Sequence, residues 1–168
     1  MGLEPSLDAF RHANSKIKPV IKVDILHPKL FDRNTFDLIA AFQVFDHIPD
    51  PNRFLRVCHS FLKPGGILVL MNHDVDSLSA KLLGEKSPIF DIEHTFLYSQ
   101  NTIRRILENH DFRVKKIYSP LAVFNLRYCL MLLPLPISIK NALEHSKNWL
   151  LDINFRIPPG NLAVYAQK

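Results

Sequence analysis

The sequence is poor in glycine, and the few glycines are scattered along the chain. They are Gly2, Gly65, Gly66, Gly84 and Gly160. They form no GxGxG pattern, which is the signature of a glycine-rich loop that follows a strand and cradles a nucleotide. The adjacent pair, Gly65 and Gly66, follows a proline and precedes an apolar run, which is typical of a turn before a strand. The sequence therefore contains no recognisable glycine-rich nucleotide loop.

Cysteine is also scarce. Cys58 and Cys129 lie far apart and outside any CxxC pattern. This spacing predicts two free thiols in a reducing compartment. We therefore expect a cytoplasmic protein.

Neither a long apolar run nor a block of one charge occurs. The most apolar stretch, residues 121–137, contains Asn125, Arg127 and two prolines, so it is too short and too interrupted to span a bilayer comfortably. The 21 Lys and Arg residues exceed the 16 Asp and Glu residues but are spread out, so we do not expect nucleic-acid binding. The net charge of +5 leaves contact with an anionic membrane surface open.

The remaining composition is that of an ordinary globular domain. The chain has 168 residues, of which 47% are hydrophobic and 22% are charged, so we expect residues 1–168 to form a single domain. Helix signals alternate with strand signals, which predicts an α/β fold with a largely parallel sheet. The expected helices are 6–16, 50–62, 77–83 and 99–112, and the expected strands are 19–26, 36–42, 67–71, 113–119 and 161–168. Residues 120–155 are expected to form a helical insertion or lid before the last strand.

Two nearly continuous apolar runs flank one well-marked helix. FDLIAAF (36–42) and ILVLM (67–71) are typical of strands buried on both faces. Asp50 is placed to cap the helix between them, and Pro51 suits its first turn. The KPGG sequence (63–66) should stop this helix.

Asp46 and His47 follow the first of these strands. In open α/β sheets, ligands bind outside the carboxyl ends of the strands, so this polar pair should border a pocket. His47 could accept a proton from a hydroxyl or amine as a general base. It could equally contact a substrate or close a loop as a structural residue. Asp46 could orient His47 or cap the following turn.

The order of these segments resembles the class I S-adenosylmethionine-dependent methyltransferases, in the branch that acts on small molecules. FDLIAAF resembles the fourth strand of that family and LKPGGILVL the approach to its fifth strand. QVFDHIPDP resembles the intervening loop, with Phe45-Asp46-His47 where Leu-Glu-His is usual. EHTFLYSQNTIRRILENHDFRV and GNLAVYAQK resemble later family segments. The resemblance implies a Rossmann-like sheet with helices on both faces.

The same resemblance implies a cofactor, S-adenosylmethionine, and residues that hold it. Glu4, followed by Pro5, matches the acidic residue that binds both ribose hydroxyls, a task that suits a carboxylate. Asp24 is the nearest match to a second acidic residue, which meets the adenine amine. By position, Ala41, Phe42 and Gln43 would flank the methionine part of the cofactor.

The family's first strand and its glycine-rich loop precede the position of Glu4. The resemblance therefore implies that both are missing and that the domain is incomplete. The two strands that normally flank the first strand would lose their shared partner. An open sheet edge of this kind favours self-association.

Further downstream, His94 resembles a family position near the active-site lid. His94 and Tyr98 are candidate substrate contacts, although both could be packing residues. His73, Asp74 and Asp76 form a polar cluster after residues 67–71. A turn explains this cluster as well as a metal site would, and we expect no metal.

These features predict methyl transfer to a small-molecule or glycan- or lipid-linked acceptor, by the C-terminal part of a larger enzyme. The alternative is a non-catalytic, truncated methyltransferase-like interaction module. A nicotinamide oxidoreductase is a third interpretation, in which the LKPGG and DHIPDP segments match by coincidence.

Overall fold

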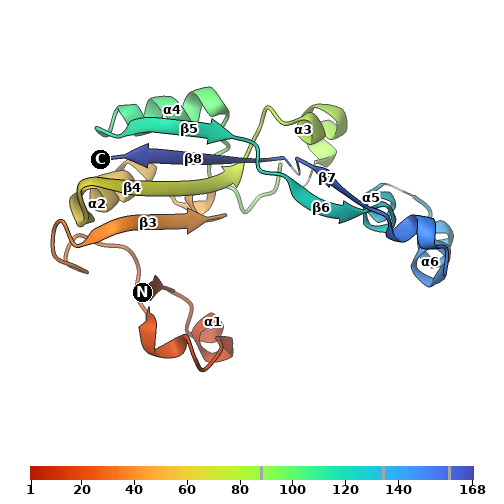
Figure 1. The fold of residues 1–168 in the computed structure, drawn as a ribbon, viewed down its shortest axis with the longest axis horizontal. Helices are drawn as coiled ribbons and strands as arrows, with labels where there is room; N and C mark the ends of the chain where they lie inside the picture. Colours follow the sequence, from red (N-terminus) through yellow and green to blue (C-terminus); the bar gives the residue numbers. More distant parts are fainter. Residues whose placement is uncertain (88, 134, 159) are drawn as a thin grey trace.

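A four-stranded sheet forms the centre of the molecule (Figure 1). The structure is a computed structural model that describes residues 1–87, 89–133, 135–158 and 160–168. The sheet has the order β3-β4-β8-β5. Its strands are β3 (Phe36–Phe42), β4 (Leu62–His73), β5 (Arg113–Tyr118) and β8 (Asn161–Gln167).

Strand direction in this sheet is mixed. β3 and β4 pair in parallel, whereas β8 runs antiparallel to both of its neighbours, β4 and β5. The expectation of a largely parallel sheet is therefore wrong for this sheet, because the closing strand inserts between β4 and β5 in the opposite direction. The expected α/β class is confirmed.

Two helices contribute to the main core. They are α2 (Pro51–Phe61) and α4 (Gln100–Glu108). Both supply buried side chains to one apolar cluster, whose strand side chains include Leu68, Leu70, Leu162 and Val164. The Asp50 carboxylate accepts a hydrogen bond from the backbone N–H of Arg53, which confirms the expected N-cap.

The helix α2 ends at Phe61, as the KPGG sequence predicts. β4, however, begins at Leu62, earlier than the expected strand 67–71. Gly65 adopts a φ of 80° in this segment, and the pairing with β3 shifts register between Phe36 and Leu38. The strand therefore begins with an irregular segment, and the apolar run marks only its regular part.

The N-terminal segment forms a small unit of its own beside β3 (Figure 1). β1 (Gly2–Leu3) pairs in parallel with β2 (Ile21–Lys22), and α1 (Leu7–His12) lies between them in sequence. The expected strand 19–26 is mostly wrong, because Lys18–Val20 form a 3-10 turn and β1 offers only a two-residue partner.

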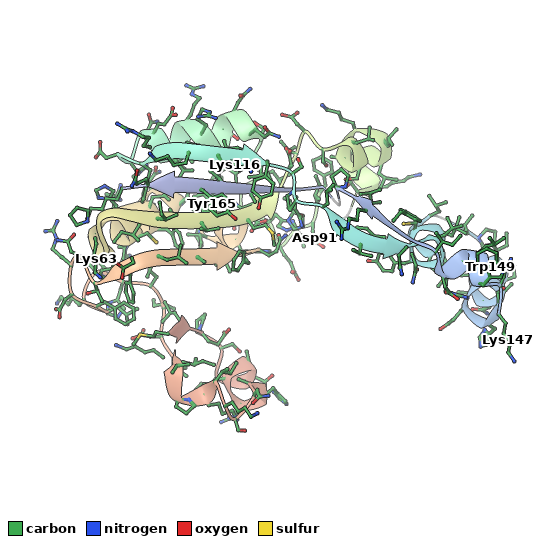
Figure 2. The ribbon with its side chains drawn as sticks, viewed as in Figure 1. Lys63, Asp91, Lys116, Lys147, Trp149 and Tyr165 are labelled. Atoms are coloured by element: carbon green, nitrogen blue, oxygen red, sulfur yellow. The ribbon has the colours of Figure 1, made fainter. Side chains whose placement is uncertain are left out.

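Residues 121–157 form an arm that extends away from the sheet (Figures 1 and 2). β6 (Ala122–Asn125) and β7 (Asn154–Ile157) pair antiparallel at its base. Beyond them lie α5 (Leu126–Leu132), α6 (Ile137–His145) and a 3-10 turn, Trp149–Asp152. The Arg127 guanidinium ties these parts together, donating to the carbonyls of Leu143 and Ser146 and pairing with Asp152. The expected helices are present, but the sequence did not reveal the two strands.

The remaining helical segments are short. They are α3 (Leu78–Leu83), a 3-10 turn at Gly84–Lys86 and another at Phe45–His47. Within the described residues, no helix has both the length and the apolar character needed to cross a membrane.

β3 is exposed, contrary to the expectation that it is buried on both faces. Leu38 and Phe42 are each 57% exposed, and Ala41 is the one residue of this strand in the buried class. Among the described residues, β3 pairs with β4 alone. The opposite edge of β3 faces a cavity, which explains why an apolar strand keeps so much exposed surface.

Candidate functional site

A cavity of about 440 Å³ lies between β1 and β3. Most of the side chains that line it are apolar. They come from the N-terminal unit (Met1, Gly2, Leu3, Pro5, Asp24, Ile25, Leu26), from Phe31, from β3 and the turn after it (Phe36, Leu38, Ile39, Ala40, Ala41, Phe42, Val44, Ile48), and from α2 (Phe54, Cys58, Phe61). A cavity with apolar walls and a few polar groups is the usual form of a small-molecule site.

Four of the six residues expected to bind a cofactor line this cavity. Pro5 and Asp24 line it from the N-terminal unit, and Ala41 and Phe42 line it from β3. Glu4 and Gln43 are not among the lining residues, although each is next to one of them in the sequence. Segments that are far apart in sequence thus meet across one cavity.

The two carboxylates expected to bind the cofactor, Glu4 and Asp24, take part in local hydrogen bonds. Glu4 Oε1 accepts from the Ser6 backbone N–H at 2.8 Å, which leaves Oε2 for another donor. Asp24 Oδ1 accepts from the Ile25 backbone N–H at 2.8 Å. This backbone bond lowers the pKa of Asp24 below its usual value, and His27, 3.4 Å away, lowers it further. Asp24 is therefore an anionic acceptor at the cavity.

Gln43 marks the carboxyl end of β3. Its φ of 53° is in the left-handed region, which is uncommon for a residue with a side chain. Its backbone N–H donates to the Met71 carbonyl at 2.7 Å, and its side-chain oxygen is buried without a hydrogen-bond partner among the described residues. Unusual backbone and an unpaired buried oxygen are features that gather at functional sites.

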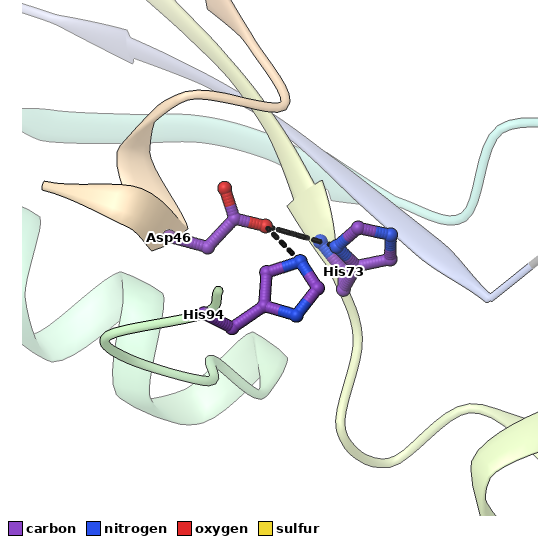
Figure 3. A group of neighbouring side chains, drawn as sticks. All are labelled: Asp46, His73 and His94. Carbon is purple, nitrogen blue, oxygen red and sulfur yellow. Dashed lines mark hydrogen bonds and ion pairs between the residues drawn. The ribbon is translucent and has the colours of Figure 1, made fainter. Parts of the chain in front are cut away.

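Asp46 lies at the centre of a histidine cluster (Figure 3). Its side chain is 1% exposed. Asp46 Oδ2 lies 2.9 Å from His73 Nδ1, at a hydrogen-bond distance, and 3.9 Å from His94 Nε2. His47 Nε2 lies 3.8 Å from Asp46 Oδ1. The three imidazole rings therefore surround one buried carboxylate.

Backbone contacts fix the segment that contributes His94. The Asp46 carbonyl accepts hydrogen bonds from the backbone N–H groups of Thr95 and Phe96 at 2.9 and 3.1 Å. His47 Nδ1 lies 2.9 Å from the Glu93 carbonyl, and a carbonyl can only accept, so Nδ1 is the donor. In the neutral ring, His47 Nε2 is then unprotonated and can accept a proton.

The charge of Asp46 is set by opposing effects. Burial acts to raise the pKa of this carboxyl group, but hydrogen bonds from the His73 side chain and from backbone N–H groups outweigh it. The pKa of Asp46 therefore lies below its usual value, and the carboxylate stays ionised.

Tyr98 packs against Phe45, the residue that precedes Asp46 in the chain. It is 5% exposed, and its ring stacks on Phe45 with a centroid separation of 5.0 Å. Burial and then the charge of Asp46 raise the pKa of its hydroxyl. The hydroxyl is buried without a hydrogen-bond partner among the described residues. Tyr98 thus supports the cluster from inside the fold.

The structure groups His73 with other partners than the sequence suggested. Asp74 Oδ1 accepts from the Asp76 backbone N–H at 3.0 Å, so these two residues close a turn. His73 joins Asp46 and His94 instead. Its place at the end of β4 was the available signal, because the carboxyl ends of parallel neighbours such as β3 and β4 lie at the same sheet edge.

Comparison with known proteins identifies the family. A model of a methyltransferase domain matches residues 2–117. The chain belongs to this methyltransferase family. The expected resemblance to class I methyltransferases is thus confirmed, and the family found is not that of the nicotinamide oxidoreductase interpretation.

Curated relatives match over shorter stretches. A ubiquinone biosynthesis O-methyltransferase from Caulobacter vibrioides is 37% identical over 51 residues, which cover 29% of this chain and 20% of the relative. One from Shewanella sp. is 23% identical over 100 residues, covering 53% of this chain and 42% of the relative. The chain thus spans less than half the length of these relatives.

Solved structures share the fold over the whole chain. A putative methyltransferase from Bacillus halodurans has a TM-score of 0.63 at 16% identity, covering 99% of this chain and 81% of its own. A SAM-dependent methyltransferase from Archaeoglobus fulgidus has the same TM-score and identity, covering 99% of this chain and 75% of its own. At this identity, the likeness shows the Rossmann-like fold.

Proposed function

We propose that this chain is an S-adenosylmethionine-dependent methyltransferase domain that acts on a small-molecule acceptor. The cofactor would occupy the cavity between β1 and β3, and the acceptor would approach the edge that holds Asp46 and His47. The meeting of Pro5 and Asp24 with Ala41 and Phe42 around one cavity is the observation that supports this proposal.

The residues around the cavity fit the chemistry of this cofactor. The apolar walls suit the adenine ring, and the anionic Asp24 carboxylate can accept from an amine or hydroxyl. Glu4 Oε2 is available to a ribose hydroxyl. Gln43, with its unpaired buried oxygen beside β3, can accept from the amino group of the methionine part.

When bound, the cofactor supplies an electrophilic methyl group on a positively charged sulfur. The chain has to align the acceptor with that group and exclude water. His47 Nε2 is placed to take the proton of the acceptor nucleophile, because Nδ1 donates to the Glu93 carbonyl. The Asp46 carboxylate faces that ring, with Oδ1 3.8 Å from His47 Nε2.

A hydroxyl is the acceptor group that we favour. The curated relatives are named as O-methyltransferases of ubiquinone biosynthesis. A small aromatic or lipid-linked hydroxyl compound agrees with this chemistry. His94, at the same sheet edge, would contact that compound. Tyr98, which is buried, would support the acceptor site from inside the fold.

We infer that the described chain is one methyltransferase domain in which residues 120–155 are an insertion before β8. The insertion forms most of the arm. All residues found to line the cavity lie between Met1 and Phe61. No residue of the arm is among those found to line the cavity, which argues against a role for the arm as its lid. We assign the arm to contacts away from the cavity.

Titration calorimetry with S-adenosylhomocysteine tests the proposed function. We expect saturable binding to the purified chain, and about tenfold weaker binding for Phe42→Ala, whose ring lines the cavity. Val123→Ala is the matched control, because Val123 is 60% exposed on the arm and Phe42 is 57% exposed. A folded chain that releases no heat would contradict the proposal.

The second candidate is a non-catalytic interaction module. The exposed Leu38 and Phe42 on an open strand edge favour it, because such edges pair with other chains. In that case, sedimentation would show association that depends on concentration, and Leu38→Lys would suppress it. Association without binding of S-adenosylhomocysteine would support the module over the enzyme.

A further inference from the structure

The histidine cluster contains a set of metal-ligand atoms. Asp46, His73 and His94 each offer one such atom, and these atoms lie within 4.8 Å of one another. Figure 3 shows the three side chains converging from three segments of the chain. We propose that they bind one divalent transition-metal ion, with Zn²⁺ as the best match to two imidazoles and one carboxylate.

The distances are close to those of a bound ion. Ligands of a tetrahedral zinc site, each about 2.0–2.1 Å from the metal, lie roughly 3.3 Å apart. Asp46 Oδ2 lies 2.9 Å from His73 Nδ1 and 3.9 Å from His94 Nε2. The third pair of ligand atoms, on His73 and His94, lies within 4.8 Å, so the two rings have to move toward the ion to reach that spacing. The ion replaces the proton between His73 and Asp46, and in a neutral His73 ring this proton moves through solvent to Nε2, so that the ring stays a neutral ligand.

The cluster is closed off from solvent, which suits a bound ion. Asp46 Oδ1 and His94 Nδ1, the far atoms of two of the three side chains, are both buried without a hydrogen-bond partner among the described residues. An unpaired buried polar atom is costly, and a bidentate Asp46 carboxylate would give Oδ1 a partner in the ion. The His94 side chain is 8% exposed and the Asp46 side chain 1%, so solvent gives these atoms little compensation.

The ligand set also selects the class of ion. Mg²⁺ and Ca²⁺ prefer oxygen ligands, so a site with two imidazole nitrogens disfavours them. Three protein ligands leave a fourth position open for water or another small ligand. The His73 side chain, 25% exposed, gives the ion a route from solvent. This inference goes beyond methyl transfer and does not depend on the cofactor.

Cobalt binding tests the proposal in the absence of any cofactor. After treatment with a chelator, the chain should bind one Co²⁺ with a visible absorption band, and Zn²⁺ should displace it. Loss of a residue that only orients a metal ligand typically weakens metal binding about 10- to 100-fold. His94→Ala removes a ligand itself and should weaken binding by at least about 10-fold. His12→Ala is the matched control, because His12 pairs with Asp8 at 3.6 Å on the exposed surface.

Two further measurements keep the test decisive if His94→Ala does not fold. His73→Gln retains a hydrogen-bond donor toward Asp46 but lacks the imidazole, and it should lose the same band. In the wild-type chain, Zn²⁺ should shift the ring NMR signals of His73 and His94 and leave those of His12 unchanged. Equal Co²⁺ binding by the ligand variants, or no shift at these two histidines, would overturn the proposal.

Discussion

β3 and β4 have similar sequences but different surroundings. FDLIAAF and ILVLM are both nearly continuous apolar runs, and the two strands pair with each other in parallel. β4 has β8 on its other side, and its Leu68 and Leu70 are 0% exposed. β3 has a cavity on its other side, and its Leu38 is 57% exposed. An apolar run thus predicts a strand, but the neighbouring strands decide whether it is buried.

The two sides of the sheet also differ in what they contribute to the protein: one side holds the core and the other holds the cavity. The side of the sheet formed by β4, β8 and β5 holds the main core with α2 and α4. The side formed by β3 and the N-terminal unit holds the cavity and the residues expected to bind the cofactor. We therefore expect substitutions on the β4 side to change stability and those on the β3 side to change binding.

A leucine truncation on each strand should give the largest contrast. Leu70→Ala, at a fully buried position of β4, should lower the free energy of unfolding by about 2–5 kcal/mol. Leu38→Ala, on exposed β3, should lower it by less than about 1 kcal/mol. Urea denaturation followed by circular dichroism measures both. Equal losses would show that β3 is buried in solution.

A glycine substitution on each side should give a smaller contrast. A Cβ at Gly66 in β4 would meet the backbone oxygens of Lys63 and Asp37 at 3.0 and 3.2 Å, so Gly66→Ala should lower the free energy of unfolding by about 1–3 kcal/mol. A Cβ at Gly2 in β1 would lie 3.7 Å from Ile21, an ordinary contact, so Gly2→Ala should be nearly neutral. Thermal melts compare them, and a neutral Gly66→Ala would contradict the close approach.

Thiol labelling can show how often the β3 side opens. Cys58 lines the cavity yet is 0% exposed, and burial raises the pKa of its thiol to about 12. Cys129, on the arm, is partly exposed. We expect a thiol reagent at neutral pH to label Cys129 first and Cys58 only through opening or unfolding. The Cys129→Ser variant isolates the Cys58 rate, and immediate labelling in that variant would contradict its burial.

His59 on α2 should give the smallest effect, through pH. Burial and the nearby charges of Lys168 and Arg33 lower its pKa below the usual value of 6.5. Between the two pKa values the unfolded chain binds more protons, so the His59 contribution to stability falls as the pH drops below about 6.5. The free energy of unfolding of His59→Gln should depend less on pH in this window. An unchanged pH dependence would contradict the prediction.

Local signals in the sequence predicted much of the fold. Asp50 and Pro51 marked the start of α2, and Ser99 marked the start of α4, because caps act through neighbouring residues. The β6–β7 pairing was missed, since its two strands lie far apart in sequence and carry no turn signal. The exposure of β3 was missed because it depends on what lies beside the strand.

The site was predictable only where its residues are marked by local signals in the sequence. Asp46 and His47 were found because they directly follow a strand whose apolar run is clear. The approach of His73 and His94 to Asp46 depends on the pairing of β3 with β4 and on the loop bound to the Asp46 carbonyl. No spacing rule in the sequence brings these three residues together.

Mapping NMR chemical shifts with S-adenosylhomocysteine is the most direct test of the central claim, that the cavity between β1 and β3 binds the cofactor. We predict that the ligand shifts the backbone signals of Asp24, Ala41, Phe42 and Gln43 and leaves those of the arm unchanged. Absence of shifts in a folded sample, or shifts confined to the arm, would contradict the account.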